Sequence, residues 1–146
     1  MKLLYGRDAE LVAMAEPISA SRFRDDAKTI GVEIEGDIRA IFVFDTFSTT
    51  GCYVHISARR MRDWLPADPR DVLTPVFAFP FLQCGYARIT TTISARNRPS
   101  LAFTKWIGGT REGLLRRACP DGSDLVVFGM LRQECRWLPP VPENRL

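Results

Sequence analysis

The chain has 146 residues, of which 46% are hydrophobic and 25% are charged, and its formal net charge is +3. The length supports one sizeable core but not two, so we predict a single globular domain spanning residues 1–146. No apolar run approaches the roughly 18 residues that cross a bilayer, and the start, MKLLYGRDAE, is too short an apolar run for a secretory signal, so we expect a cytoplasmic protein with no membrane partner.

The first half of the chain predicts one helix followed by three strands. Residues 7–15 suit a short helix that ends before Pro17, and the polar residues 18–29 are expected to form a loop. Strands are expected at residues 30–35, 38–47 and 52–58. The short stretches EGD and STTG between them are typical turns and predict an antiparallel meander.

The second half predicts two helices that alternate with strands. Asp68 followed by Pro69 is a helix-start signal, and Pro75 and Pro80 predict that this helix is bent before it ends at Gly85. The later elements are expected to be a strand at 87–94, a helix at 98–107 and a hairpin with strands at 110–119 and 125–131. The proline-rich tail from about residue 139 is expected to be loosely held.

This order of elements indicates the fold class. A helix between two strands allows parallel pairing, whereas the hairpins require antiparallel pairing. We therefore predict an α/β fold, more exactly a mixed α+β arrangement, in which a mostly antiparallel sheet carries helices on both faces.

The cysteines offer little chemistry. Cys52, Cys84, Cys119 and Cys135 are far apart in the sequence, and His55 is the only histidine. This set lacks the spacing of a zinc site, so we predict no metal and reduced, mostly buried thiols. A nucleophilic role for Cys84 or Cys119 has no supporting pattern.

A strand is followed by Asn97, by Ser100, by a helix ending at Gly108 and by the stretch REGLLRR. With these features residues 30–138, most specifically 87–137, resemble the ribosomal-protein-type members of the GNAT superfamily of acetyl-CoA-dependent N-acetyltransferases. The later stretch VVFGMLRQECRWL is similar to the last strand and tail of small GNAT-like proteins, several of them phage-encoded. The resemblance implies a GNAT-like sheet with splayed central parallel strands.

The resemblance also implies a site for acetyl-CoA as co-substrate. Its pantetheine arm would enter between VHISA and ITTTIS, two strands that are expected to diverge after Ala58 and Ser94. From sequence alone, Asn97 and Ser100 first indicate the start of the next helix, where Asn97 is its cap, and contact with the cofactor comes second; the two roles are compatible. The arginines of the loop after residue 58 also suit a solvated basic surface. The implied cofactor-binding residues are Ile56, Ala58, Arg59, Arg60, Arg62, Asn97 and Ser100.

Direct attack of an amine on a thioester requires a base, and three residues are catalytic candidates. His55 lies on a strand that would flank the cofactor, and its intrinsic pKa of about 6.5 suits a base, although a structural role suits it as well. Glu33, like Glu35, alternates with apolar neighbours and faces either solvent or the acceptor groove. Tyr53 shares the face of His55 and is an acid or a packing residue, and Asp45 is a weaker candidate for the base.

Three departures from the family pattern keep other functions open. No glycine lies between Gly51 and Gly85, where a glycine-rich phosphate loop is usual; Gly109 replaces an aromatic residue; and Thr104 stands in place of an acidic tyrosine. One alternative is a catalytically degenerate GNAT-fold protein with a binding or structural role. Another is a phage-type protein that modifies nucleic acid, although the mild net charge weakens it. Its basic face would draw on Arg59, Arg60, Arg62, Arg70, Arg88, Arg96, Arg98, Arg111, Arg116, Arg117 and Arg132.

The expected partner is a small-molecule or protein amine that accepts the acyl group. Acceptor sites are built from variable loops, so the sequence does not identify the amine. A homodimer is compatible with the stretch ECRWLPPVP, which is expected to expose Trp137 so that it covers an edge of a neighbouring copy.

Overall fold

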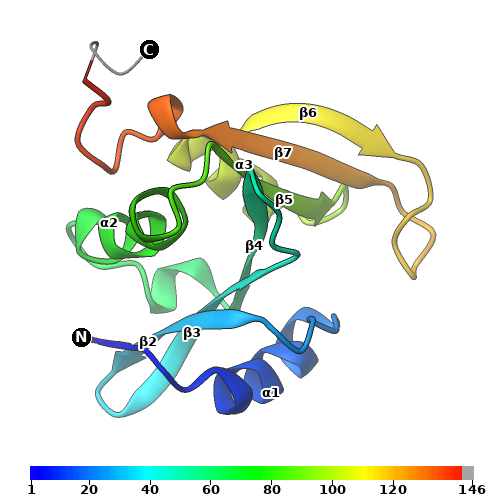
Figure 1. The fold of residues 1–146 in the computed structure, drawn as a ribbon. Helices are drawn as coiled ribbons and strands as arrows, with labels where there is room; N and C mark the ends of the chain where they lie inside the picture. The colour runs from blue at the N-terminus through cyan, green and yellow to red at the C-terminus, as the bar shows by residue number, and fades with distance from the viewer. Residues whose placement is uncertain (143–146) are drawn as a thin grey trace.

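The structure is a computed structural model that describes residues 1–142. Within these residues seven strands form one sheet in the order β1-β2-β3-β4-β5-β7-β6 (Figure 1). The strands are β1 (Lys2–Leu4), β2 (Lys28–Ile34), β3 (Asp37–Asp45), β4 (Gly51–Ala58), β5 (Arg88–Ser94), β6 (Thr110–Leu115) and β7 (Leu125–Leu131). The helices are α1 (Asp8–Ser19), α2 (Arg70–Ala78) and α3 (Arg98–Ile107), with short helical turns η1 (Met61–Asp63), η2 (Phe79–Gln83) and η3 (Arg132–Glu134).

The sheet is mixed, as predicted. β4 and β5 pair in parallel, and the other neighbouring strands pair antiparallel. The meander of β2, β3 and β4 and the hairpin of β6 and β7 both form, but β6 ends at Leu115 and not at the predicted residue 119. β1 was not predicted, because a three-residue edge strand is too short to show a periodic pattern.

α1 is longer than predicted. It continues through Pro17 to Ser19, so the prediction that proline ends it was wrong. Pro17 lacks a donor for the carbonyl of Ala13, but both residues are exposed and water can bond that carbonyl instead. The helix ends at Ala20, which takes a left-handed conformation with φ of 50°.

α2 begins and bends as the sequence predicts. The Asp68 side chain accepts a hydrogen bond from the backbone N–H of Arg70 at 3.0 Å. Pro80 cannot donate, so the last turn widens into the π-helical turn η2, in which the N–H of Cys84 reaches the carbonyl of Phe79 at 3.0 Å. Gly85 then reverses the chain with φ of +70°.

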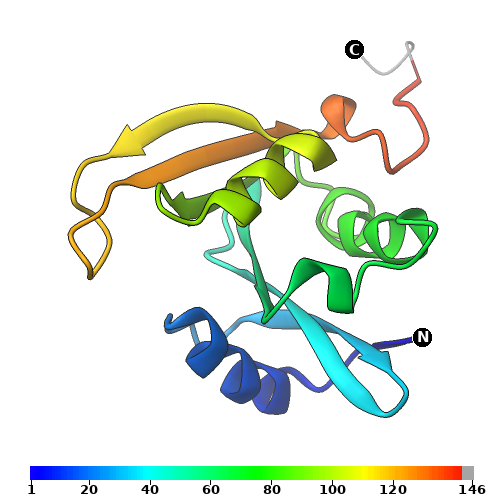
Figure 2. The same ribbon diagram turned by 180° about the vertical axis from the view of Figure 1, so that it is seen from behind.

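The two faces of the sheet are covered by different helices. α2 and α3 pack on the larger apolar core, which includes Phe42, Val54 and Ile89, whereas α1 packs on a smaller core on the opposite face with Ile41 and Val43 (Figures 1 and 2). Alternation along β4 therefore directs Cys52, Val54 and Ile56 toward α2 and α3, and Tyr53, His55 and Ser57 toward α1. None of the helices in residues 1–142 is long and apolar enough to cross a membrane.

The segment after β7 fastens α2 to α3. Trp137 donates its indole N–H to the carbonyl of Ile107 at 2.8 Å, and the hydroxyl of Thr74 donates to the carbonyl of Trp137 at 2.7 Å. Trp137 is 7% exposed, so the expectation that it is exposed for a neighbouring copy was wrong. A large aromatic side chain gains more by filling the groove of its own chain. Residues 139–142 are exposed, and the rest of the expected tail lies outside the described residues.

Candidate functional site

β4 and β5 separate in the middle of the sheet. They pair only at Gly51 with Arg88, Cys52 with Ile89, and Tyr53 with Thr90. β4 then remains with β3 to its end, and β5 remains with β7 to its end, so the two halves of the sheet turn away from each other (Figure 1). The divergence is as expected, but it starts well before Ala58 and Ser94. The outer partners and the twist of each half separate the strands earlier than strand length alone predicts.

The backbone of β4 points into this gap. The carbonyl of Thr50 accepts from the N–H of Arg88 at 3.2 Å, which shows the side on which β4 turns its peptide groups toward β5. Every second residue of a strand directs its N–H and C=O to the same side. Ile56 and Ala58 therefore direct theirs toward β5 in the region where β5 has already moved away. Ile56 and Ala58, two of the seven predicted cofactor-binding residues, thus present to the gap peptide groups that do not pair with β5.

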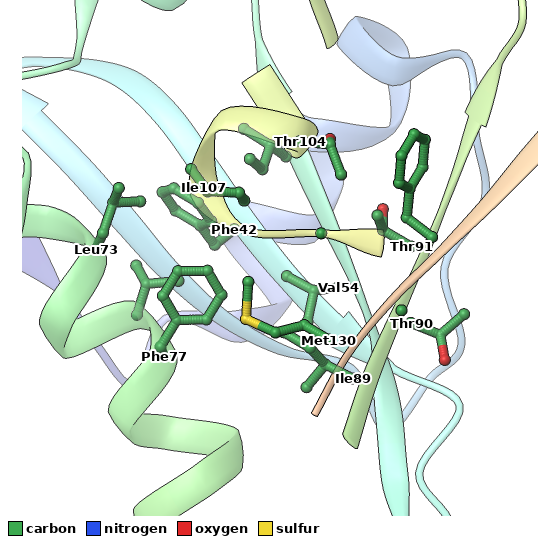
Figure 3. A pocket seen from close by; sticks show the side chains of 15 residues that line it. Phe42, Val54, Leu73, Phe77, Ile89, Thr90, Thr91, Thr104, Ile107 and Met130 are labelled. Atoms are coloured by element: carbon green, nitrogen blue, oxygen red, sulfur yellow. The ribbon is translucent and has the colours of Figure 1, made fainter. Parts of the chain in front are cut away.

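An apolar cavity of about 50 Å³ lies beside the gap on the side of α2 and α3 (Figure 3). Its walls are formed by residues of β3, β4, β5 and β7 and of the helices α2 and α3, and the lining contains no charged group within the described residues. Residues at its wall include Val54, Ile89, Thr91, Thr104, Ile107 and Met130.

His55 lies on the opposite face, next to the first unpaired residues of β4. Its Nε2 is 3.3 Å from Oδ1 of Asp45, the last residue of β3. The other oxygen of Asp45 accepts the backbone N–H of Arg24 at 3.2 Å, and the hydroxyl of Thr46 donates to Oδ1 at 3.3 Å. The ring of Phe23 lies 5.1 Å from the imidazole, centroid to centroid. The imidazole is therefore held by a carboxylate and by the loop between α1 and β2.

Asp45 is ionised at neutral pH. Burial by itself raises the pKa of Asp45, but the hydrogen bonds from His55, Arg24 and Thr46 outweigh burial, and the pKa of the carboxyl lies below its ordinary value. The Asp45 carboxylate, 3.3 Å from Nε2 of His55, is placed to stabilise positive charge on the imidazole.

The other two catalytic candidates have different surroundings. The ring of Tyr53 lies 6.5 Å from that of His55, so the structure brings these two residues together. Glu33 lies on β2 opposite Ile38, two strands away from the gap and beyond the last pair of β3 with β4. The structure therefore separates Glu33 from the rest of the predicted site, because the alternating pattern that singled it out says nothing of strand order.

Arg59, Arg60 and Arg62 are exposed on the loop that joins β4 to α2. Within residues 1–142 none of the three takes part in an ion pair. Trp64 anchors the loop: it is fully buried, and its ring packs edge-on against Phe42 and Phe103 at 5.4 and 5.7 Å. An aromatic anchor thus holds this loop, which contains no glycine, in place.

Asn97 caps α3. Its Oδ1 accepts the backbone N–H of Ser100 at 3.3 Å, which confirms the capping role that the sequence suggested. Asn97 is exposed and follows β5 at the open end of the gap. A contact of Asn97 or Ser100 with a cofactor stays a prediction.

The cysteines do not form an alternative centre. All four are free; Cys52 and Cys135 are buried, Cys84 is exposed and Cys119 is intermediate. Burial raises the pKa of Cys52 to about 12 and also raises that of Cys84. Neither thiol is thus prepared to act as a thiolate nucleophile.

Two parts of the site were not assigned from the sequence. Asp45 was ranked only as a weak base, whereas the structure makes it the partner of His55; the signal was a lone carboxylate at the end of an apolar strand. The cavity was not foreseen, although the alternation of Ile89 with Thr91 already placed both on one face of β5.

Comparisons with known proteins agree with this architecture. No family model matches the chain. It is 27% identical over 128 residues to the SPbeta prophage-derived uncharacterized N-acetyltransferase YokL of Bacillus subtilis, a match that covers 83% of this chain and 71% of that protein. A mutant of the spermidine N-acetyltransferase SpeG of Vibrio cholerae matches in structure with a TM-score of 0.73 and 10% identity, over 94% of this chain and 98% of that one. Another solved chain, acetyltransferase-like, matches 84% of this chain with a TM-score of 0.66 and 17% identity, and this chain spans 64% of its length.

The structural match to SpeG covers nearly all of this chain. At such low sequence identity, the structural similarity establishes the fold alone. In sequence, the chain is similar to YokL, a protein named as an N-acetyltransferase. The chain is therefore a GNAT-fold protein, similar in sequence to a prophage-derived N-acetyltransferase.

Proposed function

We propose that the protein is an acyl-CoA-dependent N-acyltransferase that moves an acetyl group from acetyl-CoA to an amine by direct attack. The observation that carries the proposal is the gap between β4 and β5, into which Ile56 and Ala58 direct their peptide groups. These groups fit the amides of a pantetheine arm, which can replace the missing strand pairing. The arm carries its thioester toward the apex of the gap, where β4 and β5 rejoin at Tyr53 and Thr90.

The phosphates of the co-substrate bind the loop after β4 in this proposal. Arg59, Arg60 and Arg62 supply the positive charge that attracts the phosphates. Replacing the three with glutamine together should weaken acetyl-CoA binding about tenfold at low salt, since each exposed charge contributes roughly 0.5 kcal/mol. Replacing Arg116 and Arg117, on the turn of the β6–β7 hairpin, with glutamine is the control and should leave acetyl-CoA binding unchanged.

The acceptor amine approaches from the face of α1. His55 takes the proton of the attacking nitrogen at Nδ1, while Asp45 holds Nε2–H and stabilises the imidazolium that results. The new bond joins the amine nitrogen to the carbonyl carbon, the carbon–sulfur bond breaks, and CoA leaves as a thiolate. Asp45 is a positioning residue in this scheme, and the loop that carries Phe23 and Arg24 forms a wall of the acceptor site.

Calorimetry and thermal shift with acetyl-CoA test the binding step, and release of free CoA with a panel of amines tests transfer. The panel should include spermidine, because one structural neighbour is a spermidine N-acetyltransferase. His55→Ala should lower turnover by at least about a hundredfold and leave acetyl-CoA binding nearly intact. Absence of binding at millimolar acetyl-CoA would rule out the transferase, and unchanged turnover in His55→Ala would remove His55 as the base.

A catalytically degenerate binding protein is the second candidate function. Thr104 stands where a proton donor for the thiolate is expected, and its hydroxyl is a poor acid. Tight binding of acetyl-CoA without transfer to any amine would favour this candidate. The nucleic-acid alternative has less support, since Arg88 and Arg96 are paired with Glu112 and Asp121. A steep dependence of DNA binding on salt would revive it.

A further inference from the structure

The cavity beside the gap begins where strand pairing ends. Val54 directly follows the last residue of β4 that pairs with β5, and Thr91 directly follows the last residue of β5 that pairs with β4. Both residues line the cavity (Figure 3). An arm that lies in the gap in place of a strand can go no further than this apex. The group at the tip of the arm therefore lies against the mouth of the cavity.

The lining suits hydrocarbon. Besides Val54, its walls are built by Ile89 of β5, Phe77 of α2, Ile107 of α3 and Met130 of β7. An apolar cavity of about 150 Å³ holds the six carbons of benzene and stays dry when empty. In proportion, the 50 Å³ available here has room for about two carbon atoms.

The cavity is kept open by the structure around it. Thr74 of α2 and Ile107 of α3 are both hydrogen-bonded to Trp137, which lies between the two helices. Trp137 therefore keeps α2 and α3 from approaching each other and filling the space. Thr104 and Gly109 form part of the wall on the side of α3 and pack closely against each other. Cavities whose surroundings cannot relax remain as binding volume instead of collapsing.

We propose that the enzyme accepts straight-chain acyl groups longer than acetyl, namely propionyl and butyryl, and that this cavity holds the carbons beyond the acetyl group. The inference rests on the proposed transferase function and specifies its acyl donor. The acceptor approaches from the face of His55, whereas the acyl chain extends to the opposite face, between α2 and α3. The chemistry is unchanged: the same carbon–sulfur bond breaks and the same amide forms.

The test is a chain-length series of CoA, acetyl-CoA, propionyl-CoA, butyryl-CoA and hexanoyl-CoA, measured by calorimetry. Each methylene that enters the cavity should raise affinity about fourfold, up to butyryl, from the usual free energy of burying a CH₂ group. Hexanoyl-CoA should bind more weakly than butyryl-CoA, because about two carbons fill the space.

Two substitutions on β5 form a matched pair. Thr91→Ile adds carbon to the cavity wall and should lower the butyryl-to-acetyl affinity ratio about tenfold. Thr92→Ile makes the same chemical change on the opposite face of the strand and should leave the ratio unchanged. If Thr91→Ile does not fold, Thr104→Leu fills the same space from α3, and the wild-type series decides by itself.

The outcomes separate the two proposals. Binding of CoA and acetyl-CoA with no gain for propionyl or butyryl would overturn the acyl-chain inference and leave the transferase standing. Failure of CoA and every acyl-CoA to bind would overturn the proposed function and the inference with it. An unaltered chain-length ratio in both Thr91→Ile and Thr104→Leu would show that longer chains lie elsewhere.

Discussion

The charge of Asp45 should stabilise the folded protein in a pH-dependent way. Its side chain is 7% exposed and accepts from three groups: the imidazole of His55, the N–H of Arg24 and the hydroxyl of Thr46. Asp45→Asn keeps the shape of the protonated side chain but removes the charge. A hydrogen bond to a charged group contributes about 1.5–3 kcal/mol against about 0.5–1.5 for a neutral pair, so we expect a loss of about 1–2 kcal/mol.

The sign of the pH effect follows from the direction of the pKa shift. The pKa of Asp45 is lower in the folded protein than its ordinary value, so its carboxylate stabilises the fold above the unfolded-state pKa. This stabilisation is lost as the pH falls from the unfolded-state pKa, about 3.9, through the folded-state pKa. At pH 7 the variant should therefore be less stable than the wild type, and at the acid end of this window the two should converge.

Urea unfolding of both proteins at a series of pH values measures this difference directly. A loss of 1–2 kcal/mol corresponds to a fall in melting temperature of about 2–8 °C for a domain of this size. Asp26 is exposed on a turn and takes part in no ion pair within residues 1–142, so Asp26→Asn is the control with no expected effect. A difference between wild type and Asp45→Asn that is the same at every pH would refute the electrostatic reasoning and leave only a change of hydrogen-bond geometry.

Three further substitutions test how the site is supported. Gly109→Ala should destabilise the fold by about 1–3 kcal/mol, because a Cβ there would lie 2.8 Å from Cγ2 of Thr104. Gly113→Ala is the control: its Cβ would meet nothing within 4 Å, so the loss of stability should be much smaller. Equal losses in the two variants would contradict the packing argument. Asn97→Ala should cost about 1 kcal/mol in urea unfolding through loss of the α3 cap, and a neutral result would mean that water replaces it. Trp137→Phe leaves the buried carbonyl of Ile107 without its donor and should lower the free energy of unfolding by about 1–3 kcal/mol. Unchanged calorimetric unfolding would show that this hydrogen bond does not stabilise the fold.

Local signals in the sequence were sufficient for most individual elements. α3 spans the predicted residues 98–107, since its start depends on Asn97 and Pro99 and its end on Gly108, all within a few residues. The bend after α2 was equally readable, because Pro80 removes a donor wherever the helix packs. Strand positions followed from alternation, and the mixed sheet followed from the order of helices and turns.

Only the tertiary structure decided what the site contains. His55 meets Asp45 because the register of β3 on β4 places Asp45 beside Tyr53, and register depends on pairing along the whole sheet. The point where β4 leaves β5 depends on the strands outside them, which is why the divergence comes earlier than the strand lengths predict.

The cavity and the position of Trp137 have the same origin. The cavity is space that remains among β3, β4, β5, β7 and two helices, and no local pattern encodes the volume left among six elements. Trp137 is near the end of the chain, where a sequence pattern suggests exposure, yet it bonds to α3 some thirty residues earlier. The sequence by itself determined the two ends of α3 and the order of most helices and strands, because capping and periodicity act over a few residues. Packing between distant segments decided how far α1 continues and which side chains face the gap.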